Sequence, residues 1–103
     1  MKRTEVLNSA NHIIHGERQE AYGTPEDNFT KIAGMWSAYL DTDITAEDVA
    51  AMMILLKTAR VKSGHGTDDN WVDIAGYAAC GGEIQSRGHE DVPENPAEMR
   101  WDA

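Results

Sequence analysis

The chain has 103 residues, and its nine basic and eighteen acidic residues give a formal charge of −9 at pH 7. This length favours one domain, and the shortage of cations argues against a nucleic-acid polymer as the partner, because phosphate-backbone contacts need clustered lysine and arginine. A single cysteine excludes a disulfide framework, and the lack of any long apolar run or signal-peptide core predicts a cytoplasmic protein without membrane contact.

Two helices are predicted in the first 40 residues. Apolar residues recur at three- and four-residue steps from Val6 to Ile14, which predicts a helix of about 13 residues that Gly16 ends. The sequence Thr24-Pro25-Glu26-Asp27 is typical of a helix start, with threonine as the N-cap and proline at the first helical position. The apolar residues from Phe29 to Leu40 keep the helical spacing, which predicts the second helix.

Two further helices follow. Thr45 and Asp48 resemble a capping box that opens the third helix. Residues 49–56 are all apolar, and a helix without a polar face is normally buried on several sides, either centrally in a bundle or at a subunit interface. The fourth helix is expected from Asp68 to about Arg87, and its small residues between positions 76 and 82 would allow another helix to approach closely. Among them, Cys80 is expected to be a buried packing residue.

These segments predict an all-α, four-helix bundle-like domain over residues 1–88. Four short helices cannot easily cover residues 49–56 alone, so we expect the domain to be completed by oligomerisation and the protein to be a homo-oligomer. After Gly88 the sequence is acidic, contains two prolines and has no periodicity. Residues 89–103 are therefore predicted to form a flexible tail.

Asp73 is the strongest lead to a functional site. It lies one turn inside a helical segment that is rich in small and apolar residues, where a charge is costly unless it is paired, hydrogen-bonded or bound to a metal. Asp69 and Tyr77 are four residues away on either side, so all three share one helical face. Two carboxylates on one face are able to bind a divalent cation such as Mg²⁺, which in turn suggests a phosphorylated ligand. The alternative is an ion pair between Asp73 and Lys57 or Arg60.

Glu47 and Asp48 extend the group of candidate metal ligands. They open the third helix, whereas Asp69 and Asp73 open the fourth. In a simple antiparallel hairpin the two pairs would lie at opposite ends, so bringing them together requires a crossing angle, a broken helix or a second subunit. The alternative for Asp48 is a capping role, and for Asp69 it is a favourable interaction with the helix dipole.

Cations and aromatic side chains complete the predicted site. Lys57 and Arg60 share a helical face and, with Arg18 and Lys31, would hold a phosphate through charge and hydrogen bonds. The alternative for Lys57 and Arg60 is stabilisation of the helix C-terminus and salt bridging. The aromatic residues Tyr22 and Trp71 are candidates for stacking on a nucleobase, and the alternative for both is a place in the core.

Three separated motifs carry a family resemblance. The segments ERQEAYGTPEDNF, ITAEDVAAMMILLKTAR and NWVDIAGYAACGGEI occur in this order, and together they resemble a family of small phage and prophage proteins of uncharacterised function. More distantly, the chain is similar to nucleotide-modification-associated domains and to the MazG-like all-α nucleoside triphosphate pyrophosphohydrolases. The resemblance covers most of residues 12–86.

The distant resemblance implies a magnesium-binding pattern that this chain keeps only in part. Those hydrolases carry an EExxE motif on one helix and an ExxD motif on a later helix. Glu47-Asp48 stands where the first pair would fall, but Ala51 replaces the third carboxylate. Asp73 matches the final aspartate, whereas Asn70 replaces the glutamate before it. Two expected ligands are missing, which favours ligand binding without hydrolysis over catalysis by the family mechanism.

Three functional hypotheses follow. In the first, the protein is a phage enzyme that cleaves a nucleoside triphosphate, with Mg²⁺ held by Asp69 and Asp73 together with Asp48 or Glu47. Lys57 and Arg60 would then neutralise the charge that develops on the phosphates. In the second hypothesis the protein binds or sequesters a nucleotide without turnover. In the third it is a structural homo-oligomer.

Overall fold

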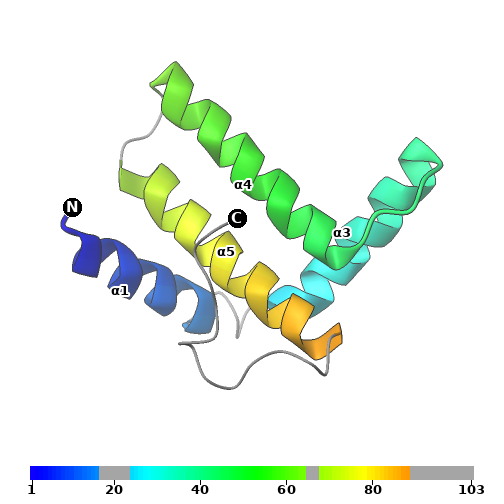
Figure 1. The fold of residues 1–103 in the computed structure, drawn as a ribbon, viewed down its shortest axis with the longest axis horizontal. Helices are drawn as coiled ribbons and strands as arrows, with labels where there is room; N and C mark the ends of the chain where they lie inside the picture. The colour runs from blue at the N-terminus through cyan, green and yellow to red at the C-terminus, as the bar shows by residue number, and fades with distance from the viewer. Residues whose placement is uncertain (17–23, 65–67, 89–103) are drawn as a thin grey trace, which may run out of the picture.

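The computed structural model describes residues 1–16, 24–64 and 68–88. Over these ranges the chain forms helices and no strand: α1 (Arg3–His15), α3 (Pro25–Leu40), α4 (Ala46–Ser63) and α5 (Asp68–Gly88) (Figure 1). The predicted all-α fold with four helices is therefore confirmed. The predicted tail, residues 89–103, lies outside the described residues.

The helix starts follow the predicted capping residues. The Thr24 hydroxyl accepts a hydrogen bond from the Asp27 backbone N–H, and Pro25 occupies the first helical position of α3. At α4 the capping box is complete, because the Asp48 N–H donates to the Thr45 hydroxyl at 3.1 Å and the Thr45 N–H donates to an Asp48 carboxylate oxygen at 2.9 Å. Each pair satisfies backbone groups that the helix itself leaves without partners.

We expect Thr45→Ala to lower the free energy of unfolding by about 1 kcal/mol, because the Asp48 N–H loses its acceptor. Chemical denaturation followed by circular dichroism measures this loss. Thr42→Ala is the matched control, since Thr42 is exposed in the preceding turn, and its effect should stay within about 0.5 kcal/mol. Equal losses in the two variants would show that the cap does not hold the start of α4.

The connection between α3 and α4 is tied by a side chain that the sequence did not single out. The Ser37 hydroxyl donates to the Ile44 carbonyl oxygen at 3.1 Å and accepts from the Ile44 N–H at 2.9 Å. Asp41, in the left-handed region at φ 54°, ends α3 between them. These contacts fix the direction in which the chain leaves α3 and enters α4.

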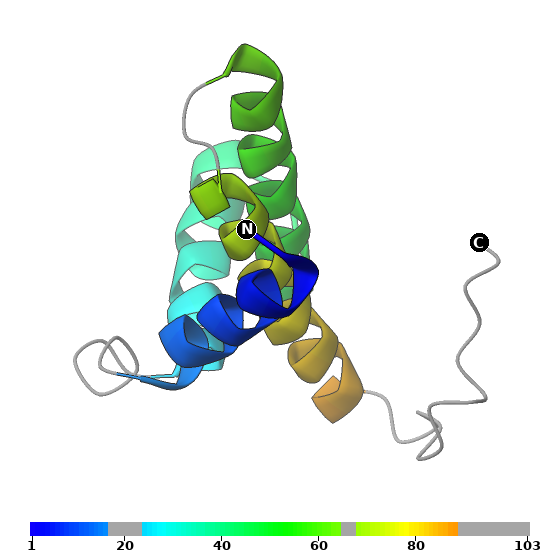
Figure 2. The ribbon, with the colours of Figure 1, turned by 90° about the vertical axis from the view of Figure 1, so that its left-hand side faces the viewer.

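α5 is the helix on which α1 and α4 pack. α1 packs on one side of it and α4 on the other, with α4 antiparallel to α5, while α3 packs mainly against α4 (Figures 1 and 2). The core at their meeting point contains Phe29, Ala33, Val49, Ala50 and Cys80. Cys80 is buried as predicted, and burial, together with the negative charges of Glu26 and Glu83, raises the pKa of its thiol.

Close helix approach occurs at two of the predicted small residues. A methyl group placed at Gly81 would lie 3.0 Å from the Ala50 Cβ, so α4 and α5 nearly touch there. A methyl group at Gly76 would lie 3.4 Å from the Ile14 Cγ2 of α1. At Gly82 nothing lies within 4 Å, so this glycine is not needed for packing.

The apolar run of α4 differs from its prediction. Val49 and Ala50 are buried, but Leu55 is 66% exposed, Leu56 46% and Met52 38%. The expectation that the whole run is buried within the bundle is therefore wrong for the single chain, and the alternative, burial at a subunit interface, stays a prediction. Because every position from 49 to 56 is apolar, the pattern held no information about which side of the helix faces α5.

Candidate functional site

An ion pair joins the middle of α4 to the beginning of α5. The Lys57 Nζ lies 2.9 Å from an Asp73 carboxylate oxygen, with the Lys57 side chain 15% exposed and the Asp73 side chain 31% exposed. The predicted alternative, a pair between Asp73 and a cation of the preceding helix, is thus confirmed for Lys57. Such a contact is screened less than a surface pair, because both groups have lost much of their water.

Asp73 and the two residues predicted to share its helical face form a gradient from solvent to core. Asp69 is exposed, Asp73 is half-buried, and Tyr77 packs against the core with its ring centroid 6.0 Å from that of Phe29. Asp73 therefore lies at the boundary, where its carboxylate reaches Lys57. The position of Tyr77 corresponds to a packing role.

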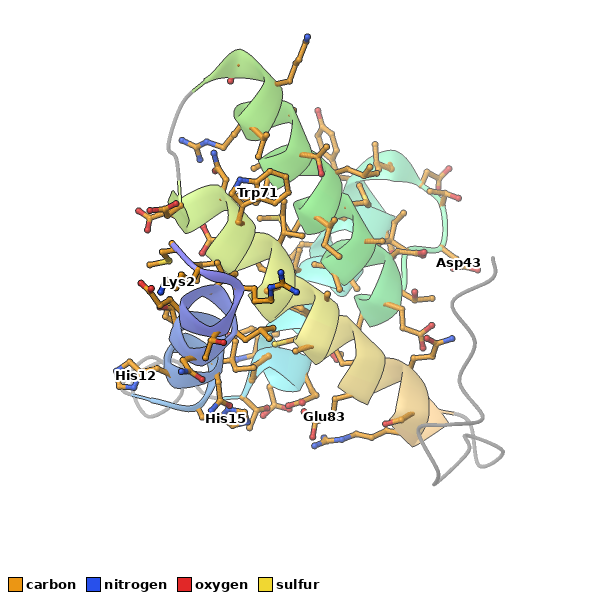
Figure 3. The ribbon with its side chains drawn as sticks, turned by 60° about the vertical axis from the view of Figure 1, so that its left-hand side comes forward. Lys2, His12, His15, Asp43, Trp71 and Glu83 are labelled. Atoms are coloured by element: carbon orange, nitrogen blue, oxygen red, sulfur yellow. The ribbon has the colours of Figure 1, made fainter. Side chains whose placement is uncertain are left out.

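The other predicted ligand-binding side chains are spread over the surface. Arg60 is exposed one turn after Lys57, and Lys31 is exposed on α3. Trp71 lies in the first turns of α5 and is 54% exposed (Figure 3). Because Trp71 precedes Asp73 by two residues, the two side chains leave the helix in nearly opposite directions. Arg18 and Tyr22 lie outside the described residues.

The four predicted metal ligands do not gather in one place. Asp48 is engaged in the capping box, and nine residues, about 13 Å of helix, separate it from Lys57. Glu47 belongs to the same first turn of α4, so it is similarly far along the helix from Lys57, the residue that Asp73 contacts. In the described ranges no three His, Cys, Asp or Glu side chains are grouped so that they could hold a metal ion.

A second polar feature lies where α1, α3 and α5 meet. A cleft of about 560 Å³ is bordered there by Ile14, His15, Thr24, Pro25, Glu26, Ala79, Cys80, Gly82, Glu83, Ser86 and Arg87. The Arg87 guanidinium lies 3.3 Å from Glu83 and 3.6 Å from Glu26. Our prediction gave Glu26 only a place in the first turn of its helix. The i, i+4 spacing of Glu83 and Arg87 was the one local sign of this cluster.

The surroundings of Glu26 in this cleft lower the pKa of its carboxyl group. Burial acts to raise its pKa, but hydrogen bonds to its own backbone N–H, to Glu83 and to Thr24, with the charge of Arg87, outweigh burial and lower the pKa. Because the folded-state pKa is below the unfolded value, Glu26 stabilises the fold at neutral pH. That contribution is lost as the pH falls through the folded-state pKa.

The fold and the site define a small all-α protein with a charged pair between two antiparallel helices, and comparison with known proteins gives its family. A family model described as a domain of unknown function, DUF6378, matches residues 5–85, so the chain belongs to that family. In the part of the chain that the structure describes, no helix is long and apolar enough to cross a membrane.

Two curated relatives are phage proteins. The chain is 42% identical over 97 residues to the "Gene 55 protein" of Mycobacterium phage D29 and 42% identical over 98 residues to the "Gene 55 protein" of Mycobacterium phage L5. Each match covers 94% of this chain, but only 61% and 62% of the respective relative. The chain thus spans less than two thirds of their length. No solved structure matches it. The predicted resemblance to a phage protein family is confirmed.

Proposed function

We propose that this protein binds a nucleotide, or another small phosphorylated ligand, between α4 and α5, with Lys57 and Arg60 as the cations that meet the phosphates. The observation that carries the proposal is the Lys57–Asp73 pair, which holds a lysine 15% exposed at a fixed position. In a chain of charge −9, a phosphate has few other places to bind. The resemblance to MazG-like proteins supports a nucleoside phosphate as the ligand.

The two cations complement each other chemically. Asp73 occupies one of the three Lys57 N–H donors and keeps the ammonium in place, so its remaining donors are oriented before a ligand arrives. Arg60 is exposed one turn further along α4 and supplies a planar fork that suits a second phosphate oxygen. The arrangement thus favours an anion with several oxygens over a single carboxylate.

Binding without turnover is the form of this proposal that the site geometry favours. The cap holds Asp48 near the far end of α4, and Asp73 is neutralised by Lys57. The hydrolase hypothesis is the second candidate. It is favoured by Asp69 and Asp73, which lie one turn apart on the same face of α5, and it requires further metal ligands beyond these two.

Nucleotide binding is tested by isothermal titration of the full chain with each nucleoside triphosphate, once in EDTA and once with Mg²⁺. We expect binding in both solutions, and we expect Lys57→Ala to weaken it by about tenfold to a hundredfold, because a charge-assisted hydrogen bond is lost. Lys62→Ala is the matched control, since it removes the same charge from an exposed position five residues further along α4. It should bind as the wild type does.

The outcomes separate the candidates. Absence of binding in both solutions, or equal affinities for Lys57→Ala and the wild type, would rule out the proposed site. Pyrophosphate release that requires Mg²⁺ and is lost in Asp73→Asn would select the hydrolase. Far-ultraviolet circular dichroism of each variant shows that the helices are intact, so that a lost ligand is not confused with a lost fold.

A further inference from the structure

The outer side of α4 carries a continuous apolar stripe that no other described element covers. Met52, Leu55, Leu56 and Ala59 follow one another at the i, i+3, i+4 and i+7 spacing that places side chains on one helical face. Their exposed fractions are 38% for Met52, 66% for Leu55 and 46% for Leu56, and Ala59 is also exposed. These four residues, called the outer stripe below, have the pattern of a helix–helix contact.

The side of α4 that faces the core, with Leu56 at its edge, shows why the outer stripe is left open. Val49, Ala50 and Met53 face the core, where α5 and α3 pack against α4. The two leucines of the outer stripe are therefore not part of the single chain's core, and their exposure costs hydrophobic free energy for as long as they meet water.

Charged side chains border the outer stripe with opposite signs at its two ends. Glu47 and Asp48 lie in the first turn of α4, whereas Arg60 and Lys62 lie in its last turn. Between Asp48 and Lys57 there is no charged residue. The helix dipole has its positive end at the first turn and its negative end at the last. A second α4 that runs in the opposite direction would bring each acidic end against a basic end.

We infer that a second copy of this chain covers the outer stripe, with the two α4 helices packed antiparallel about a two-fold axis that passes between Leu55 and Leu56. In this arrangement Leu55 meets Leu56 of the second copy, and Met52 meets its Ala59. Lys62 then lies beside the second copy's Asp48 at each end. The contact is isologous and closes at two copies, because the same surface is used on both.

The charge pattern decides in favour of a second copy over other occupants. A parallel arrangement would set Asp48 against Asp48 and Lys62 against Lys62, which places like charges together. A strongly basic partner would find no acid along the centre of the outer stripe, and a strongly acidic one would be repelled by a chain of charge −9. An uncharged stripe with one acidic and one basic end is complementary to the same stripe on a second copy that runs in the opposite direction.

The dimer is tested by sedimentation velocity on the full chain at increasing concentrations. We expect a species of about 23 kDa, twice the 11.4 kDa of the chain, to dominate by about 100 μM, because an interface of one helix per copy is small. Leu55→Glu combined with Leu56→Glu should remain monomeric over the whole range. Both positions are exposed in the single chain, so the helical circular dichroism of this variant should equal that of the wild type.

Met35→Glu combined with Tyr39→Glu is the matched control. It adds the same two charges at exposed apolar positions of α3, 71% and 88% exposed, and should dimerise as the wild type does. A wild type that stays monomeric at every concentration would overturn the proposal. Dimers that persist in the leucine double variant, or disappear in the α3 control, would show that another surface is used.

Cysteine cross-linking tests the antiparallel direction. A mixture of Met52→Cys and Ala59→Cys chains should form a disulfide-linked dimer containing one of each under mild oxidation, whereas either variant alone should not, because a disulfide needs Cα atoms less than about 7 Å apart. Cross-linking of Met52→Cys to itself would show a parallel contact and overturn the arrangement.

Lys62→Glu should raise the dimer dissociation constant by about threefold to tenfold, since two end contacts become repulsive. An unchanged constant would contradict the end contacts.

Discussion

Phe29→Ala is expected to lower the free energy of unfolding by about 3 to 5 kcal/mol, the largest loss we predict for any single replacement in this chain. Phe29 is 8% exposed and belongs to the core cluster, and its ring lies 6.0 Å from that of Tyr77. Removing it takes away apolar burial and leaves a cavity between α3, α4 and α5. For a domain of this size, such a loss is a large part of the total stability.

The measurement is a urea titration followed by circular dichroism at the helix band. Tyr39→Ala is the control, because it removes a ring of nearly the same size from the same helix at a position that is 88% exposed. We expect that variant to differ from the wild type by no more than about 0.5 kcal/mol. If both variants lose the same amount, Phe29 is not the centre of the core that the structure places there.

Gly81→Leu is the second large effect that we expect, with a loss of about 3 kcal/mol. The first carbon of any side chain at this position would lie 3.0 Å from the Ala50 Cβ. This neighbour is fixed directly to the α4 backbone and cannot rotate away, so α4 and α5 would have to separate. Separation would also pull Lys57 away from Asp73, and the proposed ligand site would be lost with the packing.

Replacement of the adjacent residue, Gly82, is the matched control. A side chain there meets nothing within 4 Å, so Gly82→Leu should be neutral or should stabilise the helix by up to about 1 kcal/mol through its higher helix propensity. Thermal unfolding of the two variants gives the comparison. A melting temperature that falls equally in both would mean that the loss at Gly81 reflects the glycine backbone and not the close contact with α4.

The helices could be predicted from the sequence because their limits are set locally. Thr24 and Thr45 each cap a backbone N–H three residues further on. Such short-range contacts can be predicted from the sequence. The sequence did not show which cation pairs with Asp73. The choice between Lys57 and Arg60 depends on how α4 and α5 are aligned along each other, and no local pattern specifies that alignment.

Only part of the candidate site could likewise be predicted from the sequence. The separation of Asp48 from Asp73 follows from an antiparallel hairpin and could be anticipated. The contact between Glu26 and Arg87 joins residues that are far apart in the chain, and only the packing of α3 near the end of α5 brings them together. The exposure of Leu55 also escaped prediction, because a run without polar residues does not reveal its outer side.

The central place of α5 has a consequence for the order of events during synthesis. α1 and α4 both pack on this helix, yet it is the last helix of the described chain to leave the ribosome. Isolated helices of this length are only marginally stable in water. α3 and α4 contact each other and can pack earlier, but α1 and the inner side of α4 keep apolar surface exposed until residues 68–88 have emerged. The core is therefore completed only when synthesis of the helical part is nearly finished.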